Sequence, residues 1–371
     1  MRRRSSNARA AGRRLASRAA TTTAWFLSVS LLDFVAGLGV PASLPAVHYS
    51  THIILPPSPF AFFPSLLAAP AAPPTPLGGG SMASSDGANG KVVLLTGANS
   101  GIGYALTLKL LAAGYTTYAT ARSVAKADDL VADAKARSLA DRLHIVEMDV
   151  SADASVADGV AAVLAATDGV LDVVISNAGY GNMAPPEAAA PPDYAANFNT
   201  NVLGTVRLAA ATLPTMRARA GGRFIATSSV AGLVGLPLSP VLVTTKHALE
   251  GLIECHAVSY AGTGVRFSLV EPGPVATAAV DNAHGLDAEV VPELRAAAKA
   301  FGSSWWGTAA PQTADDCADY FMRAVTDADP ALRYVTFKPV MDLLRVKYAD
   351  VEGRQAVAAL QELVTGSGDT E

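Results

Sequence analysis

The chain has 371 residues, of which 50% are apolar and 16% are charged, and this composition supports a buried core and excludes a disordered chain. A formal net charge of −4 provides no basic surface that could follow a phosphate backbone, so we expect no nucleic-acid partner. The two cysteines, Cys255 and Cys317, cannot form a disulfide framework and lack Cys-x-x-Cys spacing, which favours a reducing compartment. The histidines form no zinc-binding motif, and we expect no metal site.

Residues 1–90 differ in composition from the rest of the chain, because they are rich in arginine at the start and in proline further on. We expect an N-terminal extension outside the folded domain, with three open interpretations. The apolar stretch 24–40 contains Asp33 and is shorter than the ~20 residues that a membrane-spanning helix needs, which leaves membrane association uncertain. An organelle-targeting segment is the second interpretation. A translation start at Met82 is the third, and it predicts a cytoplasmic protein.

From residue 91 to about residue 350, short apolar runs alternate with segments of helical spacing. The runs predict strands at 92–96, 116–121, 143–148, 171–176, 223–227, 265–270 and 333–337. The segments between them predict helices at 102–113, 126–139, 154–166, 194–219 and 241–261. This alternation predicts an α/β fold of the Rossmann-like, doubly wound type, with a mainly parallel seven-stranded sheet and helices on both faces. Residues 351–371 are expected to form a C-terminal tail.

A glycine-rich stretch follows the first expected strand directly and opens the first expected helix. Gly97 permits a sharp turn, Gly101 lets the backbone approach a pyrophosphate, and Gly103 allows close packing of the helix on the strand. Free N–H groups at the helix N-terminus suit the anion. A turn without a ligand is the alternative, but the position between strand and helix favours a dinucleotide site made by Gly97, Asn99, Ser100, Gly101, Ile102 and Gly103.

Arg122 stands at the end of the second expected strand, where many dinucleotide folds carry an acid that binds the ribose 2′-hydroxyl. A guanidinium there can bind the additional phosphate of NADP in a bidentate manner, so we predict NADP(H) in preference to NAD(H). The alternative is that Arg122 is an ordinary solvated residue. Asp149, after the third strand, is placed to accept a hydrogen bond from the adenine amino group. Small residues after the fourth strand would let the cofactor lie against the backbone at Asn177, Ala178 and Gly179.

These motifs, together with Asn201-Val202, Ser228-Ser229 and Pro272-Gly273, occur in the order and spacing of the short-chain dehydrogenases/reductases, and the chain resembles that family over about residues 91–280. The segments 229–237, 246–252 and 332–334 resemble the subgroup of 17-beta-hydroxysteroid and photoreceptor-type retinol dehydrogenases. The resemblance implies an NADP(H)-dependent oxidoreductase acting on the alcohol/ketone pair of a lipophilic, steroid- or retinoid-like substrate. It also implies a homodimer, and further cofactor contacts from Lys246, Pro272, Gly273, Val275 and Thr277.

The resemblance further implies a catalytic set of Asn, Ser, Tyr and Lys, in which the tyrosine lies thirteen positions beyond the serine and four before the lysine. Asn201, Ser229 and Lys246 match this set, but Leu242 occupies the tyrosine position. The tyrosine gives a proton to the alkoxide that hydride transfer leaves, and leucine has no proton to give. Loss of catalysis, rescue by another group such as Lys246, and an error in the sequence are the three interpretations. We therefore expect an impaired enzyme, with a non-catalytic NADP(H)-binding sensor or scaffold as the alternative.

The segment 277–310 loses regular periodicity and contains several large apolar and aromatic residues: Leu286, Val290, Val291, Phe301, Trp305 and Trp306. Apolar walls suit a lipophilic substrate, and we interpret the segment as a substrate lid. An ordinary helical excursion packed on the core is the alternative.

Overall fold

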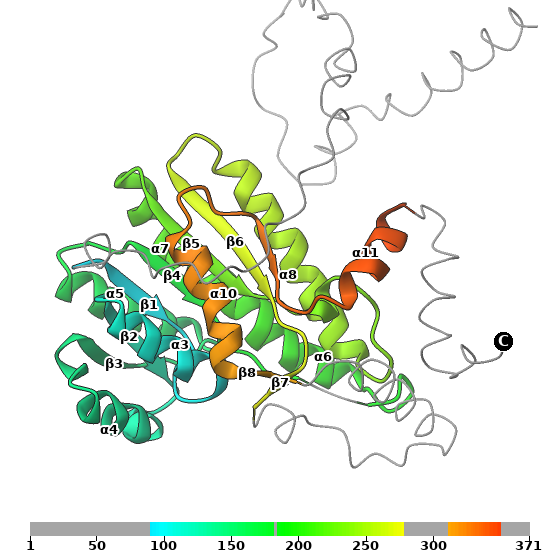
Figure 1. Ribbon diagram of the computed structural model, residues 1–371, viewed down its shortest axis with the longest axis horizontal. Helices are drawn as coiled ribbons and strands as arrows, with labels where there is room; N and C mark the ends of the chain where they lie inside the picture. Colours follow the sequence, from blue (N-terminus) through cyan, green and yellow to red (C-terminus); the bar gives the residue numbers. More distant parts are fainter. Residues whose placement is uncertain (1–89, 182–183, 278–310, 350–371) are drawn as a thin grey trace, which may run out of the picture. The chain divides into compact units, whose positions relative to one another are not determined.

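The computed structural model describes residues 90–181, 184–277 and 311–349, and within these a seven-stranded sheet has the order β3-β2-β1-β4-β5-β6-β9 (Figure 1). Every neighbouring pair of strands in it is parallel. From β1 the chain builds outward in one direction through β2 and β3 and then in the other from β4, so the predicted doubly wound fold is confirmed. The strands are β1 Val92–Leu95, β2 Thr116–Ala121, β3 Leu143–Glu147, β4 Val173–Ser176, β5 Gly222–Thr227, β6 Val265–Glu271 and β9 Arg333–Val335.

Helices cover both faces of the sheet, because successive side chains of the buried strands point to opposite sides. In β1, Val93 and Leu95 belong to one core cluster, with side chains of α3 (Gly101–Ala112), α4 (Asp128–Ala136) and α10 (Ala314–Thr326). Leu94 belongs to a second cluster on the opposite face, with side chains of α5 (Asp153–Ala166), α7 (Gly204–Ala218) and α8 (Pro240–Ser259). The near-continuous apolar runs of the sequence reflect strands that are buried on both sides.

Two predicted helices differ in detail from the observed ones. The segment predicted as one helix at 194–219 consists of α6 (Pro191–Phe198), a π-helical turn (Asn199–Leu203) and α7. The segment predicted at 126–139 begins with a 3-10 turn (Val124–Ala127) before α4. A single π turn is too short for the spacing of apolar residues to distinguish it from the α-helix around it.

The structure also contains elements that the sequence analysis did not predict. These are α10, α11 (Val340–Ala349), the 3-10 turns Ala140–Arg142 and Val230–Gly232, and a short parallel pair of strands, β7 (Val275–Ala276) and β8 (Gln312–Thr313). Thr313 and Asp316 form a reciprocal capping box at the start of α10. The Thr-x-x-Asp pattern is a local signal that could have placed this helix.

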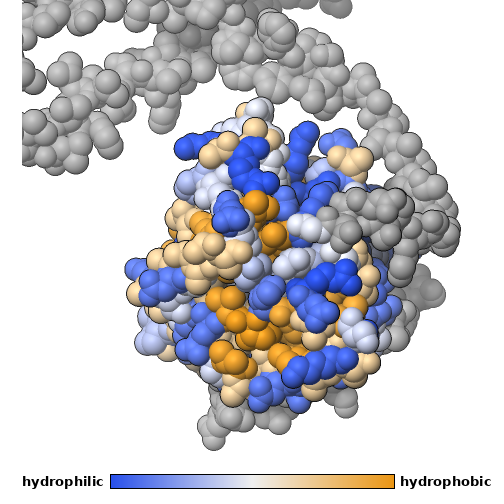
Figure 2. Space-filling view, turned by 90° about the vertical axis from the view of Figure 1, so that its left-hand side faces the viewer, coloured by the Kyte–Doolittle hydropathy of each residue, from blue (hydrophilic) through white to orange (hydrophobic). Residues whose placement is uncertain are grey.

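One edge of the sheet is formed by β3, which lies beside α4 on the left in Figure 1. Figure 2 faces this side of the molecule and shows hydrophobic areas interrupted by hydrophilic side chains. On β3 itself His144 and Glu147 are exposed. Polar side chains on an edge strand discourage pairing with a strand of another molecule.

Several predictions fall on residues outside the described ranges. They concern the extension 1–89, the lid residues 278–310 and the tail 351–371. Among the described residues, no helix combines the length and the apolarity that crossing a membrane requires.

Candidate cofactor and active site

The glycine-rich stretch forms the turn between β1 and α3, at the carboxyl edge of the sheet. Gly97 and Gly101 have φ of +68° and +55°, and residues other than glycine adopt this backbone conformation only with strain. A Cβ on Gly103 would lie 2.2 Å from the Gly97 carbonyl oxygen and 2.7 Å from the Asn177 Nδ2 atom. The turn therefore has the shape of a cradle that side chains would fill, and it leaves the N–H groups at the start of α3 for an anion.

Asn177 ties the loop after β4 to this turn. Its Nδ2 donates to the carbonyl oxygens of Thr96 and Gly97, both at 3.1 Å. In return the Thr96 hydroxyl accepts the backbone N–H groups of Asn177 at 2.9 Å and Ala178 at 3.0 Å. A Cβ on Gly97 would approach the Ala178 Cα to 2.9 Å, so the turn after β1 and the loop after β4 both need small residues here. Thr96 was not predicted as a site residue, and its position inside the Thr-Gly motif is its only local signal.

The segment after β6 also reaches the cradle. A Cβ on Gly101 would lie 3.4 Å from the Thr277 Cγ2 atom, which places Thr277 over the turn. The Pro272 carbonyl oxygen accepts the backbone N–H of Val230 at 3.0 Å and the hydroxyl of Ser229 at 3.3 Å. The structure thus brings 272–277, predicted to contact the cofactor, to the same edge as Gly101 and Ser229.

Arg122 and Asp149 follow the neighbouring strands β2 and β3. Arg122 is exposed, as a residue that binds a charged group of a ligand must be. The Asp149 carboxylate accepts the Ser151 hydroxyl at 2.6 Å and the Ser151 backbone N–H at 2.9 Å. These hydrogen bonds, with a smaller effect of the Arg122 charge, lower the pKa of Asp149, which therefore remains an acceptor at neutral pH.

Asn201 lies in the π-helical turn, and its side chain is almost fully buried. Its Nδ2 donates to the Tyr180 carbonyl oxygen at 3.0 Å and to Asn197 Oδ1 at 2.8 Å, while its Oδ1 accepts the Tyr180 N–H at 3.1 Å. A Cβ on Gly179 would lie 2.9 Å from that same oxygen. The widened turn thus clamps Asn201 to the loop that carries Ala178 and Gly179.

Lys246 extends from α8 toward β5, and its Nζ donates to the Thr227 carbonyl oxygen at 2.7 Å. A Cβ on Gly179 would be 3.9 Å from the Lys246 Nζ, so the ammonium lies beside the Asn201 clamp. Burial lowers the pKa of Lys246 to about 8, although the Glu250 carboxylate one helical turn away opposes the shift. At neutral pH this lysine is mainly protonated and is a stronger acid than an exposed lysine.

Leu242 occupies the first turn of α8, one helical turn before Lys246. Its side chain is half-buried, and a Cβ on Gly181 would lie 3.8 Å from its Cδ2 atom. The position therefore faces the loop after β4, which also approaches Asn201 and Lys246 at Gly179. The hydrocarbon side chain of Leu242 supplies packing there but no donor or acceptor.

A cluster of charged residues that the sequence did not predict includes Glu250, which lies one helical turn after Lys246 on α8. The Arg333 Nε is 2.9 Å from Glu250 Oε2 and 3.9 Å from Glu271 Oε1, and Glu271 is completely buried. Burial, together with the Glu250 charge, raises the pKa of Glu271 well above its usual value. No local pattern predicts this cluster, because its members come from α8, β6 and β9, which only the sheet order brings together.

A glycine cradle at a helix N-terminus, beside a buried lysine and a clamped asparagine, defines a dinucleotide-binding oxidoreductase site of the Rossmann type. The family model described as short chain dehydrogenase matches residues 91–285. The chain therefore belongs to the short-chain dehydrogenase family.

Relatives and solved structures agree with this assignment. The chain is 36% identical to human 17-beta-hydroxysteroid dehydrogenase type 1, over 74% of this chain and 86% of that protein. It is 37% identical to human retinol dehydrogenase 8, over 50% of this chain and 60% of the relative. A short-chain dehydrogenase from Streptomyces avermitilis superposes with a TM-score of 0.63 and 29% identity, covering 75% of this chain and 99% of the other.

Cofactor-bound structures of both kinds are also similar to this chain. A short chain dehydrogenase/reductase from Burkholderia phymatum in complex with NAD has a TM-score of 0.62 and 25% identity, covering 71% of this chain and 95% of that one. The structure described as ElxO with NADP bound has a TM-score of 0.56 and 25% identity, covering 67% and 98%. The family thus supports a nicotinamide dinucleotide as cofactor.

Proposed function

We propose that the protein is an NADP(H)-dependent oxidoreductase for the alcohol/ketone pair of a lipophilic substrate, with a rate limited by the leucine at position 242. The observation that carries the proposal is the arrangement of Asn201 and Lys246 around Gly179, at the same edge of the sheet as the glycine cradle. The steroid and retinol dehydrogenases among the relatives support a steroid- or retinoid-like substrate.

Arg122 supports the choice of NADP(H) over NAD(H). It is exposed after β2, near Asp149 in space, and a guanidinium can bind a phosphate group through two parallel hydrogen bonds. Replacing Arg122→Ala should weaken NADPH binding about tenfold or more and change NADH binding much less. Calorimetry with both cofactors measures this difference, and Arg137→Ala, at an exposed arginine after α4, is the control. Equal losses for both cofactors would contradict the preference.

In this reaction NADPH supplies the hydride, and the residues of the chain orient the carbonyl compound and supply the proton. The Ser229 hydroxyl can donate to the carbonyl oxygen once it leaves its weak 3.3 Å bond to Pro272. Lys246 holds a proton beside the Asn201 clamp, and we propose that it binds the nicotinamide ribose and is the source of a slow proton transfer, directly or through water. A missing general acid typically lowers the rate ~10²–10⁴-fold.

The test compares wild type with Leu242→Tyr in NADPH oxidation, using ketosteroids, retinal and small aldehydes as substrates. Tyrosine at position 242 should raise the rate by ~10²–10⁴-fold, because it restores a positioned donor next to a buried ammonium. Thr244→Tyr, at an exposed position of the same helix, is the matched control and should leave the rate unchanged. An equal rate for wild type and Leu242→Tyr would contradict the assigned role of position 242.

Leu242 also favours a second function, that of a non-catalytic NADP(H)-binding sensor or scaffold. This function predicts NADPH binding without turnover in wild type, and binding that is lost in Arg122→Ala. Binding without oxidation of any of the substrates named above would favour it over the slow enzyme. Absence of NADPH binding would refute both functions.

A further inference from the structure

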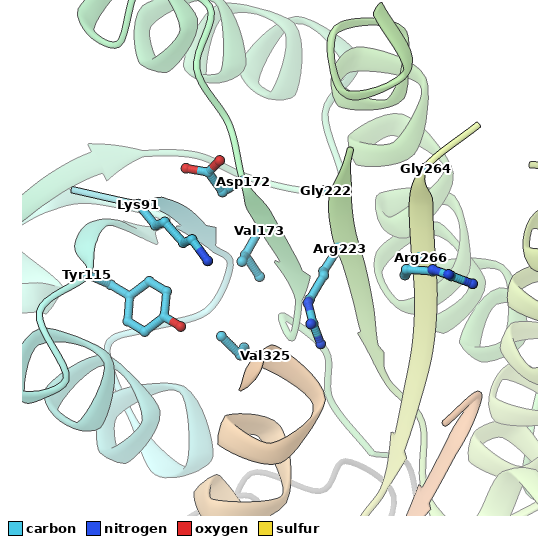
Figure 3. A pocket seen from close by; sticks show the side chains of 9 residues that line it. All are labelled: Lys91, Tyr115, Asp172, Val173, Gly222, Arg223, Gly264, Arg266 and Val325. Atoms are coloured by element: carbon cyan, nitrogen blue, oxygen red, sulfur yellow. The ribbon is translucent and has the colours of Figure 1, made fainter. Parts of the chain in front are cut away.

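A cavity of about 230 Å³ opens at the edge of the sheet opposite the candidate active site (Figure 3). The residues that line it stand where strands begin: Lys91 before β1, Asp172 before β4, and Gly222 at the start of β5. The cradle and Lys246 lie where strands end. The cavity is therefore separate from the candidate cofactor site.

Three groups that can donate hydrogen bonds converge on this cavity. Figure 3 shows the Tyr115 hydroxyl, the Lys91 ammonium and the Arg223 guanidinium directed toward the space next to Val325. Tyr115 is only 3% exposed, and its hydroxyl has no hydrogen-bond partner among the described residues. The hydroxyl oxygen is not one of the fully enclosed, unpaired polar atoms of the described residues, so it opens into the cavity and is accessible to a ligand. Burial also raises the pKa of Tyr115, so the hydroxyl keeps its proton and remains a donor.

The charges around the cavity favour an anion. Within the described residues Lys91 forms no ion pair. Arg223 donates to the carbonyl oxygens of Ala324 at 2.7 Å and Asp327 at 2.5 Å, which orients its guanidinium but does not neutralise its charge. Arg266 adds a third cation at the rim, where Figure 3 shows it directed outward.

Asp172 is the one carboxylate among the residues that line the cavity. Its Oδ2 accepts the Val92 backbone N–H at 2.8 Å, and its Oδ1 lies 3.8 Å from Arg219. In Figure 3 the carboxylate is directed away from the Tyr115 hydroxyl, and its charge contributes less than burial to the raised pKa of Tyr115. The converging groups are thus donors, and two of the three are cationic.

We propose that this cavity binds the phosphate group of a small molecule, with Tyr115, Lys91 and Arg223 as its ligands. A volume near 230 Å³ admits a phosphate with few further atoms and is smaller than the roughly 300–1,000 Å³ typical of sites for larger ligands. Three donors suit a group with three oxygens and a charge near −2. The bound phosphate bridges β1, β5 and the end of α10, so it stabilises the folded chain by an amount that grows with the phosphate concentration.

The experiment measures binding of inorganic phosphate to the full-length protein by calorimetry, with sulfate and acetate at the same ionic strength. Tyr115→Phe removes one hydroxyl and keeps the packed ring, and Lys91→Met removes one charge. Each should weaken phosphate binding about tenfold or more, because a hydrogen bond to a charged group is lost. Lys135→Met, at an exposed lysine of α4, should leave it unchanged, and Arg122→Ala separates phosphate binding in the cavity from phosphate binding at the candidate cofactor site.

Three results would overturn the proposal. The first is phosphate binding that is equal in wild type, Tyr115→Phe and Lys91→Met, or that does not saturate. The second is loss of binding in Arg122→Ala, which would place the phosphate at the candidate cofactor site. The third is acetate binding as tightly as phosphate, which would show that the cavity selects a carboxylate. Circular dichroism of each variant confirms that it is folded, so a loss of binding reports on the cavity.

Discussion

Gly103 shows how a single position can decide whether the cradle exists. A Cβ there would lie 2.2 Å from the Gly97 carbonyl oxygen, and neither the backbone oxygen nor the clamped Asn177 can move away cheaply. We predict that Gly103→Ala opens the turn and weakens binding of NADPH about tenfold or more, measured by fluorescence titration. In Gly251→Ala the new Cβ meets no atom within 4 Å, so this variant should bind normally and gain ~0.5–1 kcal/mol of helix stability. Normal binding in Gly103→Ala would contradict the close approach.

Glu271 gives a prediction on pH. Its pKa is raised by burial and by the Glu250 charge, and Arg333 opposes the shift. A carboxyl with a higher pKa in the folded than in the unfolded chain stabilises the fold fully below its unfolded pKa, near 4.5, and this contribution is lost as the pH rises through the folded pKa. Glutamine mimics the protonated form at every pH. The difference in unfolding free energy between Glu271→Gln and wild type should therefore grow with pH above 4.5.

Urea denaturation of the two proteins at a series of pH values measures this difference, since all other titrating groups are shared. Glu254→Gln is the control, because the Glu254 side chain is 59% exposed and reaches only the outer side of Arg333. A difference that does not change with pH would show that Glu271 is ionised in the folded chain and that Arg333 compensates its charge.

At the scale of elements, the π-helical turn between α6 and α7 places Asn201 against the loop after β4. The turn itself could not be predicted from residue spacing, although Asn201 was identified by its place in the family motif. Asn201→Ala removes the oxygen that accepts the Tyr180 N–H and one of the two amides that donate to the Tyr180 carbonyl oxygen, the other being that of Asn197. The loss of these buried hydrogen bonds costs ~1–3 kcal/mol. We expect Asn201→Ala to lower the free energy of unfolding by an amount in this range. Arg217→Ala, at an exposed position of α7, should change it by less than about 0.5 kcal/mol, and similar losses in both would contradict the role of the clamp.

The order of most strands and helices along the chain was predictable because each of them carries its own periodicity. The cradle was predictable because its glycines lie close together in the sequence. The hydrogen bonds of the Thr96 hydroxyl and the cluster of Glu250, Glu271 and Arg333 were not predictable. They join residues about 60 to 80 positions apart, and only the strand order brings these residues together. Leu242 was partly predictable, because the family motif located the position. Its chemical role was not predictable, since that role depends on neighbours such as Lys246.

At the scale of the whole molecule, we propose that the chain is a homodimer that associates through the face carrying α7 and α8. The family resemblance implies a dimer, and two apolar side chains three positions apart are exposed where the π-helical turn continues into α7, Leu203 at 44% and Val206 at 38%. Neighbouring exposed apolar side chains on one helix face are typical of an interface between copies. The alternative is a monomer with scattered surface apolar residues, which is common in folded proteins.

The prediction concerns Val206→Glu, which places a charge in the first turn of α7, beside Leu203. Burying an unpaired carboxylate in an interface is costly, so the variant should sediment as a monomer at concentrations where wild type is a dimer. Val124→Glu introduces the same charge at a 51% exposed valine before α4, outside the α7 and α8 face, and should leave the dimer intact. A wild type that sediments as a monomer would refute the dimer. A dimer that persists in Val206→Glu but is lost in Val124→Glu would move the interface to the other side of the sheet, since α4 packs on the face opposite α7 and α8.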